Sequence, residues 1–205
     1  TGNDNLITGD IDSSWRNSWN IILPIKTGLS NDLILFYETD NNRDLIVKTY
    51  DGTNQAIHPD VIIGHDGKYK MVMTPFPFSD DDFENPSVLE SVDGYNFTEI
   101  PGTRRPLINM PTVPPNYRNA YNNDPDVLYD NRKYFMVYNE TFSQKHEKFY
   151  QNVKMVMYDS NFSNPDSITI LKQTSYQRMT FAPSLIKANK YYMFFVGKTP
   201  DSKFE

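Results

Sequence analysis

The chain has 205 residues, a formal net charge of −6 and no cysteine. The acidic balance excludes nucleic acid as a partner, because its phosphates require clustered Lys and Arg, and it excludes polybasic membrane recognition for the same reason. The lack of cysteine excludes disulfides, thiolate nucleophiles and cysteine metal sites. Helical periodicity is nearly absent and 14 prolines divide the sequence into short pieces, so we expect an all-β fold.

In chain order, a polar linker is expected over residues 1–17 and a single β-domain over residues 18–205. Strand candidates follow in groups of four along this domain. They are Trp19–Ile25, Leu33–Glu38, Leu45–Tyr50 and Gln55–Ile57; then Asp60–Ile63, Tyr69–Thr74, Ser87–Ser91 and Asn96–Ile100; then Asp126–Tyr129, Tyr134–Asn139, Val153–Tyr158 and Ser167–Leu171; and finally Pro183–Lys187 and Tyr191–Val196.

One short phrase opens the second, third and fourth groups. It reads His58-Pro59-Asp60-Val61, then Asp124-Pro125-Asp126-Val127, then Ala182-Pro183-Ser184-Leu185, and its prolines lie 66 and 58 residues apart. A period of this length, filled with short strands, is typical of the four-stranded blades of a β-propeller. The chain then holds about three and a half blades and is expected to be incomplete at its C-terminus or completed by another chain. A β-sandwich is the alternative.

The turn from Ser91 to Phe97 supports blades in particular. Asp93 and Gly94 favour a tight hairpin between the third and fourth strands of a blade. Phe97 is placed to pack back onto that turn. The segment resembles a shortened Asp-box of sialidase-type propellers.

The repeated phrase also places polar residues near one axis. On the innermost strand of a blade, the residue before the proline faces the central channel, because the proline fixes the backbone around it. His58, Asp60, Asp124 and Asp126 are therefore candidates for a common site. The alternative is that Asp-Pro-Asp is strand-start chemistry, with carboxylates that accept hydrogen bonds from backbone amides.

Further candidates lie in the loops. Glu84 and Asn85 open the third strand of the second group and can bind sugar hydroxyls at the channel mouth. The loop over residues 101–121 is long enough to be functional, and its Tyr117 and Arg118, together with Arg178, can bind a sugar or an anion by stacking and charge-assisted bonds. No zinc-ligand spacing, phosphate-binding glycine loop or nucleophile elbow is present, so neither a metal nor a cofactor is expected.

Read as a whole, the repeat resembles the five-bladed propellers of glycoside hydrolase family 43. In that family a base and a modulator occupy Asp-Pro pairs and an acid occupies a Glu-x-Pro phrase. Asp124 matches the modulator, whereas His58 replaces the base and Phe181 replaces the acid. Hydrolysis of a glycosidic bond needs two carboxyl groups, so the resemblance implies a scaffold that has lost catalysis and kept sugar binding.

A second resemblance covers roughly residues 58–196. The segments Lys70–Pro77, Phe83–Ser87, Ser91–Gly94 and Asn123–Asp126 are similar to propeller domains of tail fibres and receptor-binding proteins of phages that infect Gram-positive bacteria. This resemblance implies a virion protein that forms a homotrimer or binds other virion subunits and recognises a cell-wall glycopolymer such as teichoic acid at the host surface.

Three hypotheses follow from the sequence. The leading one is a non-catalytic carbohydrate-binding propeller of a phage tail. The second is an active glycosidase that uses Asp124 with Glu84 or Asp60, and the third is a structural virion propeller that binds nothing. The carbohydrate-binding residues expected under the first are His58, Asp60, Glu84, Asn85, Asp124, Asp126, Tyr117, Arg118 and Arg178.

Overall fold

The structure is a computed structural model that describes residues 28–29, 37–38, 45, 47–144, 148–163, 165–173 and 179–198. Its strands are β1 (Gly28–Leu29), β2 (Tyr37–Glu38), β3 (Ala56–Ile63), β4 (Tyr69–Pro75), β5 (Ser87–Ser91), β6 (Thr98–Glu99), β7 (Asn119–Asp130), β8 (Lys133–Gln144), β9 (Lys148–Tyr158), β10 (Pro165–Gln173), β11 (Met179–Lys187) and β12 (Tyr191–Lys198). Two short 3-10 turns, η2 (Pro77–Ser79) and η3 (Asp81–Phe83), lie between β4 and β5. None of the described segments forms a helix that is long and apolar enough to cross a membrane.

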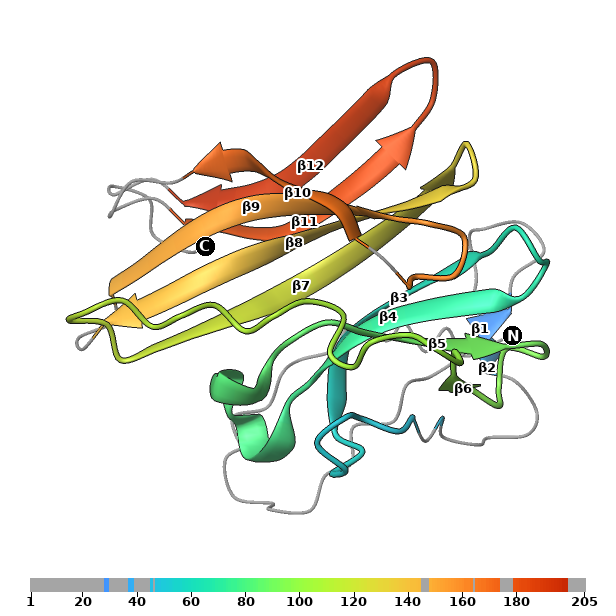
Figure 1. Cartoon of the computed structure of the whole chain (residues 1–205), viewed down its shortest axis with the longest axis horizontal. Coiled ribbons are helices and arrows are strands. Elements are labelled where there is room, and N and C mark those ends of the chain that lie inside the picture. Colours follow the sequence, from blue (N-terminus) through green and yellow to red (C-terminus); the bar gives the residue numbers. More distant parts are fainter. Residues whose placement is uncertain are drawn as a thin grey trace, which may run out of the picture.

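The described strands form consecutive antiparallel meanders, as expected for propeller blades. Strands β3 to β6 make one four-stranded sheet and β7 to β10 make the next, each in simple sequence order, while β11 and β12 form a two-stranded sheet. We call these sheets blade A, blade B and half-blade C. In Figure 1 blade A lies below blade B, and half-blade C overlaps blade B in this view. The first strand of blade B contacts the first strands of blade A and half-blade C. The fold is therefore a β-propeller arrangement rather than two facing layers.

Apolar side chains form two core clusters, one on each face of blade A. One cluster joins the facing sides of blades A and B and includes Val72, Val88, Met136, Val156 and Phe162. A second cluster covers the other face of blade A, where Leu45 and Val47 pack with Met71, Met73 and Leu89. Because neighbouring blades cover both faces of a middle strand, its sequence is apolar at consecutive positions instead of alternating.

The expected strands of the second, third and fourth groups are confirmed, but β3 and β7 begin earlier than expected, at Ala56 and Asn119 instead of Asp60 and Asp126. Gln55–Ile57 was expected to end the first group, but Ala56 and Ile57 begin β3. The strand continues through His58 and Pro59 because these residues form a bulge, where the missing proline N–H leaves no pairing position empty.

The first group is confirmed only in small part. Tyr37 and Glu38 form β2, Leu45 makes an isolated bridge, and residues 47–50 are not a strand. The expected strand Trp19–Ile25 and the linker over residues 1–17 lie outside the described residues. The Asp-Gly hairpin of blade A is as expected: Asp93 accepts hydrogen bonds from the backbone N–H groups of Tyr95 and Asn96 at 2.9 and 2.8 Å, and Phe97 is buried.

Candidate carbohydrate site

The three copies of the repeated phrase form the same β-bulge. Strand pairing skips two residues on β3, β7 and β11 for one residue on the partner strand, and the skipped pairs are His58-Pro59, Asp124-Pro125 and Ala182-Pro183. The residue before each proline has a positive φ, of 53° for His58, 50° for Asp124 and 44° for Ala182. This left-handed conformation costs a residue with a Cβ about 1–2 kcal/mol. The bulge turns the residue before the proline out of the normal alternation of the strand.

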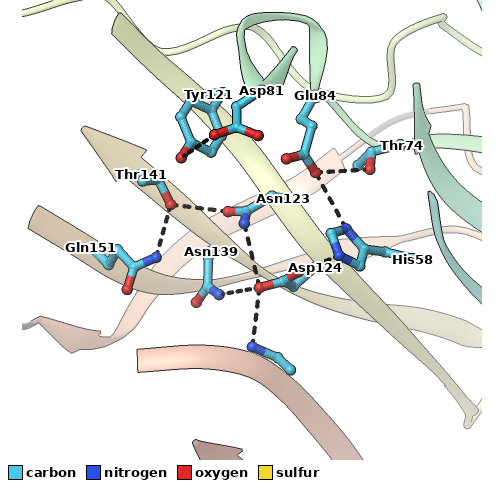
Figure 2. A network of polar contacts seen from close by, with 11 residues as sticks. His58, Thr74, Asp81, Glu84, Tyr121, Asn123, Asp124, Asn139, Thr141 and Gln151 are labelled. Atoms are coloured by element: carbon cyan, nitrogen blue, oxygen red, sulfur yellow. Dashed lines mark hydrogen bonds and ion pairs between the residues drawn. The ribbon is translucent and has the colours of Figure 1, made fainter. Parts of the chain in front are cut away.

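His58 joins two carboxylates from different parts of the fold (Figure 2). Its Nδ1 lies 3.3 Å from Glu84 Oε2, in the loop that follows β4, and its Nε2 lies 3.1 Å from Asp124 Oδ1 on β7 of the next blade. A ring nitrogen needs a proton to bond a carboxylate, so the arrangement favours the doubly protonated imidazolium. The side chains of Glu84 and Asp124 are 3% and 11% exposed, whereas that of His58 is 39% exposed.

Polar groups from three sheets hold these carboxylates in place. Glu84 Oε2 also accepts a hydrogen bond from Thr74 Oγ1 on β4, at 3.0 Å. Asp124 Oδ2 accepts bonds from Asn139 Nδ2 on β8 at 2.9 Å and from the backbone N–H of Ala182 on β11 at 3.1 Å. Asp124 thus accepts from His58 and from Ala182, and these contacts link the bulges of blade A, blade B and half-blade C.

The pKa shifts reflect burial and the contacts of this group. Burial alone would lower the pKa of His58, but its hydrogen bond to Glu84 and the charge of Asp124 outweigh burial and raise that pKa above its ordinary value. Burial also raises the pKa of Glu84, although the hydrogen bond from His58 acts in the opposite direction. Asp81 adds a third carboxylate near His58, so the local charge is anionic. It accepts a hydrogen bond from Tyr121 Oη at 3.4 Å. Burial raises the pKa of Asp81 as well.

The second acidic residue of the phrase has a different place from the first. Asp60 Oδ2 accepts a hydrogen bond from the backbone N–H of Val127 on β7, at 2.7 Å, and Asp126 Oδ2 accepts one from Leu185 on β11, also at 2.7 Å. Each carboxylate thus joins its own inner strand to the next inner strand. The backbone-amide alternative considered from the sequence describes these two residues, with the difference that the amide belongs to the following blade.

Asn85 is likewise used within the protein. It is completely buried, donates to the carbonyl oxygen of Ile108 at 2.8 Å, and accepts a bond from Asn122 Nδ2 at 2.9 Å. It therefore fixes the long loop after blade A against β7.

The loop candidates Tyr117 and Arg118 contact β8 and not His58 in the described part of the chain. Tyr117 packs edge-to-face against Phe142 with ring centroids 5.9 Å apart, and the exposed Arg118 donates its backbone N–H to Ser143 O at 2.7 Å. They are the two residues directly before Asn119, the first residue of β7, whose side chain bonds Asp82. Arg178 lies outside the described residues. No cluster of three His, Asp or Glu side chains within the described ranges is arranged to hold a metal ion.

Sequence reasoning missed two residues that contact the carboxylates, Thr74 and Asn139. They occupy the same position of the repeat, since each pairs with the last residue before a bulge. Both are completely buried. A polar residue at the end of the otherwise apolar runs Met71–Thr74 and Met136–Asn139 was the available signal.

Comparison with known proteins gave distant similarities only. No family model and no curated protein matches the sequence. Among solved structures, an exo-1,5-α-L-arabinanase from a bovine ruminal metagenomic library is similar with 10% identity and a TM-score of 0.45, over 83% of this chain and 57% of that one. A glycoside hydrolase family 43 endo-arabinanase from Bacillus licheniformis is similar with 15% identity and a TM-score of 0.31, over 68% of this chain and 65% of that one. The chain thus spans less than two thirds of either enzyme, and values this low carry no information about its chemistry.

Proposed function

We propose that this chain is a non-catalytic propeller that binds cell-wall polysaccharide at the group formed by His58, Glu84 and Asp124. The observation that carries the proposal is the contact of both His58 ring nitrogens with carboxylates, at 3.3 and 3.1 Å, while the ring stays 39% exposed. Because both ring N–H groups are bound to carboxylates, His58 offers a sugar its exposed, charged ring face, and the partly exposed Asp124 offers its remaining acceptor positions. The surrounding hydrogen bonds hold both side chains rigid before a ligand arrives.

The same contacts argue against hydrolysis. A glycosidase needs one carboxyl group that protonates the leaving oxygen and another that attacks or activates water, on either side of the scissile bond. Here both carboxylates bind one imidazolium, which lies where such a bond would have to lie. Glu84 is also almost completely buried and bonds Thr74, so it is not presented to a substrate.

Local charge narrows the ligand class. Asp81, Glu84 and Asp124 face one cation, His58, and no Lys or Arg within the described ranges forms an ion pair with these carboxylates. An anionic surface repels the phosphates of a teichoic acid backbone. We therefore expect a neutral or amino-sugar polysaccharide to bind more tightly than a phosphate-rich polymer.

The biological setting that we propose is a phage tail fibre or receptor-binding protein, acting at the surface of a Gram-positive host. Its support is the resemblance of segments such as Lys70–Pro77 and Phe83–Ser87 to such proteins. A homotrimer would raise the avidity of weak individual sites on a repeating polymer. Light scattering of the purified protein tests the oligomer: a mass three times that of the chain supports it, and a monomer at micromolar concentration contradicts it.

The binding test uses Gram-positive cell walls before and after the phosphate-containing polymers are stripped from them. Wild-type protein is compared with Asp124→Asn, which keeps the shape of the side chain, and with Asp166→Asn, a matched control that removes an exposed charge on the outer strand of blade B. We expect saturable binding to stripped walls that Asp124→Asn lowers at least tenfold and Asp166→Asn leaves unchanged. Thermal unfolding of each variant checks the fold, and equal binding by all three proteins would contradict the site.

One observation favours the second candidate, a glycosidase. Burial raises the pKa of Glu84, and a general acid needs such a shift to stay protonated near neutral pH. Measuring reducing sugar in the tubes used for binding decides between the candidates. Release of sugar by the wild type, lost in Asp124→Asn, would establish hydrolysis, whereas binding without release supports the receptor role.

A further inference from the structure

Phe78 combines an exposed aromatic ring with a strained backbone. Its side chain is 64% exposed, and its φ and ψ of 55° and 27° are left-handed. For a bulky residue this conformation is a genuine outlier that persists only where the surrounding structure enforces it. The neighbouring Ser79 is also left-handed, with a φ of 61°.

Phe162 has a left-handed backbone like that of Phe78, but its ring is buried. Phe162 has the same φ of 55°, but its ring is 1% exposed and stacks on Tyr134 with centroids 4.1 Å apart. Burial of an aromatic ring in the core stabilises the fold by more than the strain costs. The ring of Phe78 has no comparable burial, so packing does not account for its conformation.

Several hydrogen bonds hold the segment that carries Phe78. Gln55 accepts from the Phe78 N–H through its side chain at 2.9 Å and from the Phe76 N–H through its backbone at 2.8 Å. The far end of the segment is held by Tyr50, whose hydroxyl donates to Phe83 O at 2.6 Å. The ring is therefore presented from a fixed backbone, which lowers the entropy lost when a ligand binds.

This segment lies at the same end of blade A as His58. Gln55 comes directly before β3 and three residues before His58, a distance of about 10 Å at the rise of a strand. The same loop continues through η3 to Asp81 and Glu84, both labelled in Figure 2. A glycan bound at His58 therefore has an exposed aromatic ring within the length of an oligosaccharide.

We infer that Phe78 is a second contact for the glycan, an aromatic platform on which a sugar ring stacks at a distance from the unit bound at His58. The inference rests on the proposed function. The apolar face of a sugar ring fits the flat face of phenylalanine, and each such contact removes apolar surface from water. The platform makes the protein select oligosaccharides over single sugars.

The test uses fragments of one, two, four and six sugar units prepared from the wall polysaccharide that the wild type retains. Titration calorimetry compares wild type with Phe78→Ala and with Phe194→Ala, which removes a similarly exposed aromatic side chain (58% against 64%) from β12. We expect Phe78→Ala to weaken binding of the six-unit fragment about 3- to 10-fold and to leave binding of the shortest bound fragment unchanged. Phe194→Ala is expected to change neither.

Phe78→Gly adds a readout of the strain. Glycine adopts φ near 55° freely, so this variant is expected to keep or raise the melting temperature while it loses the same affinity as Phe78→Ala. Equal affinities of Phe78→Ala and wild type for the six-unit fragment would overturn the inference and leave the site at His58 intact. Equal loss for short and long fragments would also overturn it. Failure of the wild type to retain any wall polysaccharide would instead contradict the proposed function itself.

Discussion

Replacement of His58 by Gln tests the central electrostatic contact of the fold. The change removes a cation that lies 3.3 Å from Glu84 and 3.1 Å from Asp124. Removing one partner of a fully buried ion pair costs about 3–5 kcal/mol, and an exposed pair contributes about 0–1 kcal/mol. Since Glu84 is 3% exposed and His58 is 39% exposed, we place the loss between these limits, at about 1–2 kcal/mol near pH 6. For a 205-residue chain this lowers the melting temperature by about 2–8 °C.

The loss must depend on pH in a defined direction. The pKa of His58 is raised above its unfolded value of 6.5, so its stabilisation is complete below that value and is lost as the pH rises through the folded pKa. The difference between wild type and His58→Gln should therefore be largest near pH 6 and shrink toward pH 9. Burial raises the pKa of Glu84, and its protonation at lower pH removes one partner of the imidazolium, so measurements begin at about pH 5.5.

Thermal unfolding followed by circular dichroism in steps of half a pH unit provides the measurement. His65→Gln is the matched control, because His65 contacts the ring of Tyr129 and forms no ion pair within the described ranges. A difference for His58→Gln that stays constant or grows with pH would refute the assignment of an imidazolium between two carboxylates. So would a variant as stable as the wild type at pH 6.

Three further predictions concern the blades. Asp126→Ala leaves the N–H of Leu185 without its partner at 2.7 Å, so urea unfolding should show a free energy of unfolding that is lower by about 1–3 kcal/mol. The control Asp166→Ala, which removes an exposed carboxylate, should lower it by less than about 0.5 kcal/mol. Ala182→Gly should raise the free energy of unfolding by up to about 1 kcal/mol, because glycine relieves the φ of 44°; a destabilised variant contradicts the strain argument. Val137 in blade B and Phe194 in half-blade C occupy the same position of the repeat, but Val137 is 0% exposed and Phe194 is 58% exposed. In the same assay we expect Val137→Ala to lower the free energy of unfolding by about 1.5–3 kcal/mol and Phe194→Ala to lower it by less than about 0.5 kcal/mol. Equal losses would mean that another surface covers β12.

The sequence predicted the blades better than the chemistry of individual residues. The repeated phrase located the inner strands, and the aromatic runs located their partners, because a buried middle strand requires consecutive apolar residues. The same reasoning began strands after Pro59 and Pro125, at Asp60 and Asp126, whereas β3 and β7 run through both prolines, although proline normally interrupts a ladder. It could not show that a one-residue bulge removes the pairing position that the proline would leave empty.

The sequence did not identify the contact partners of the candidate residues where a backbone group of another blade is the partner. His58, Glu84 and Asp124 come together as expected for a common site, although 40 residues separate the second from the third in the sequence. The carboxylates of Asp60 and Asp126 bond backbone N–H groups of the next inner strand. Nothing in the local sequence identifies these donors, because the contact depends on how neighbouring blades are stacked.

The strained bulges themselves belong to the fold and not to the site. Strained residues often cluster at functional sites, and His58 and Asp124 taken alone fit that rule. Ala182, however, adopts the same left-handed conformation in the same bulge and has no polar side chain. Its backbone N–H bonds Asp124 of the preceding blade, so in this copy the bulge has a structural contact without a functional side chain. The bulge thus joins consecutive blades, and the side chain before the proline sets the chemistry at each bulge: an imidazole, a carboxylate or a methyl group.

Replacement of His58 by Ala should consequently leave the bulge intact while the link to Glu84 and Asp124 is lost. A crystal structure of this variant is expected to show the pairing of Ile57 and Asp60 with β4 unchanged. A shifted register of β3 would instead show that the imidazole holds the bulge in place.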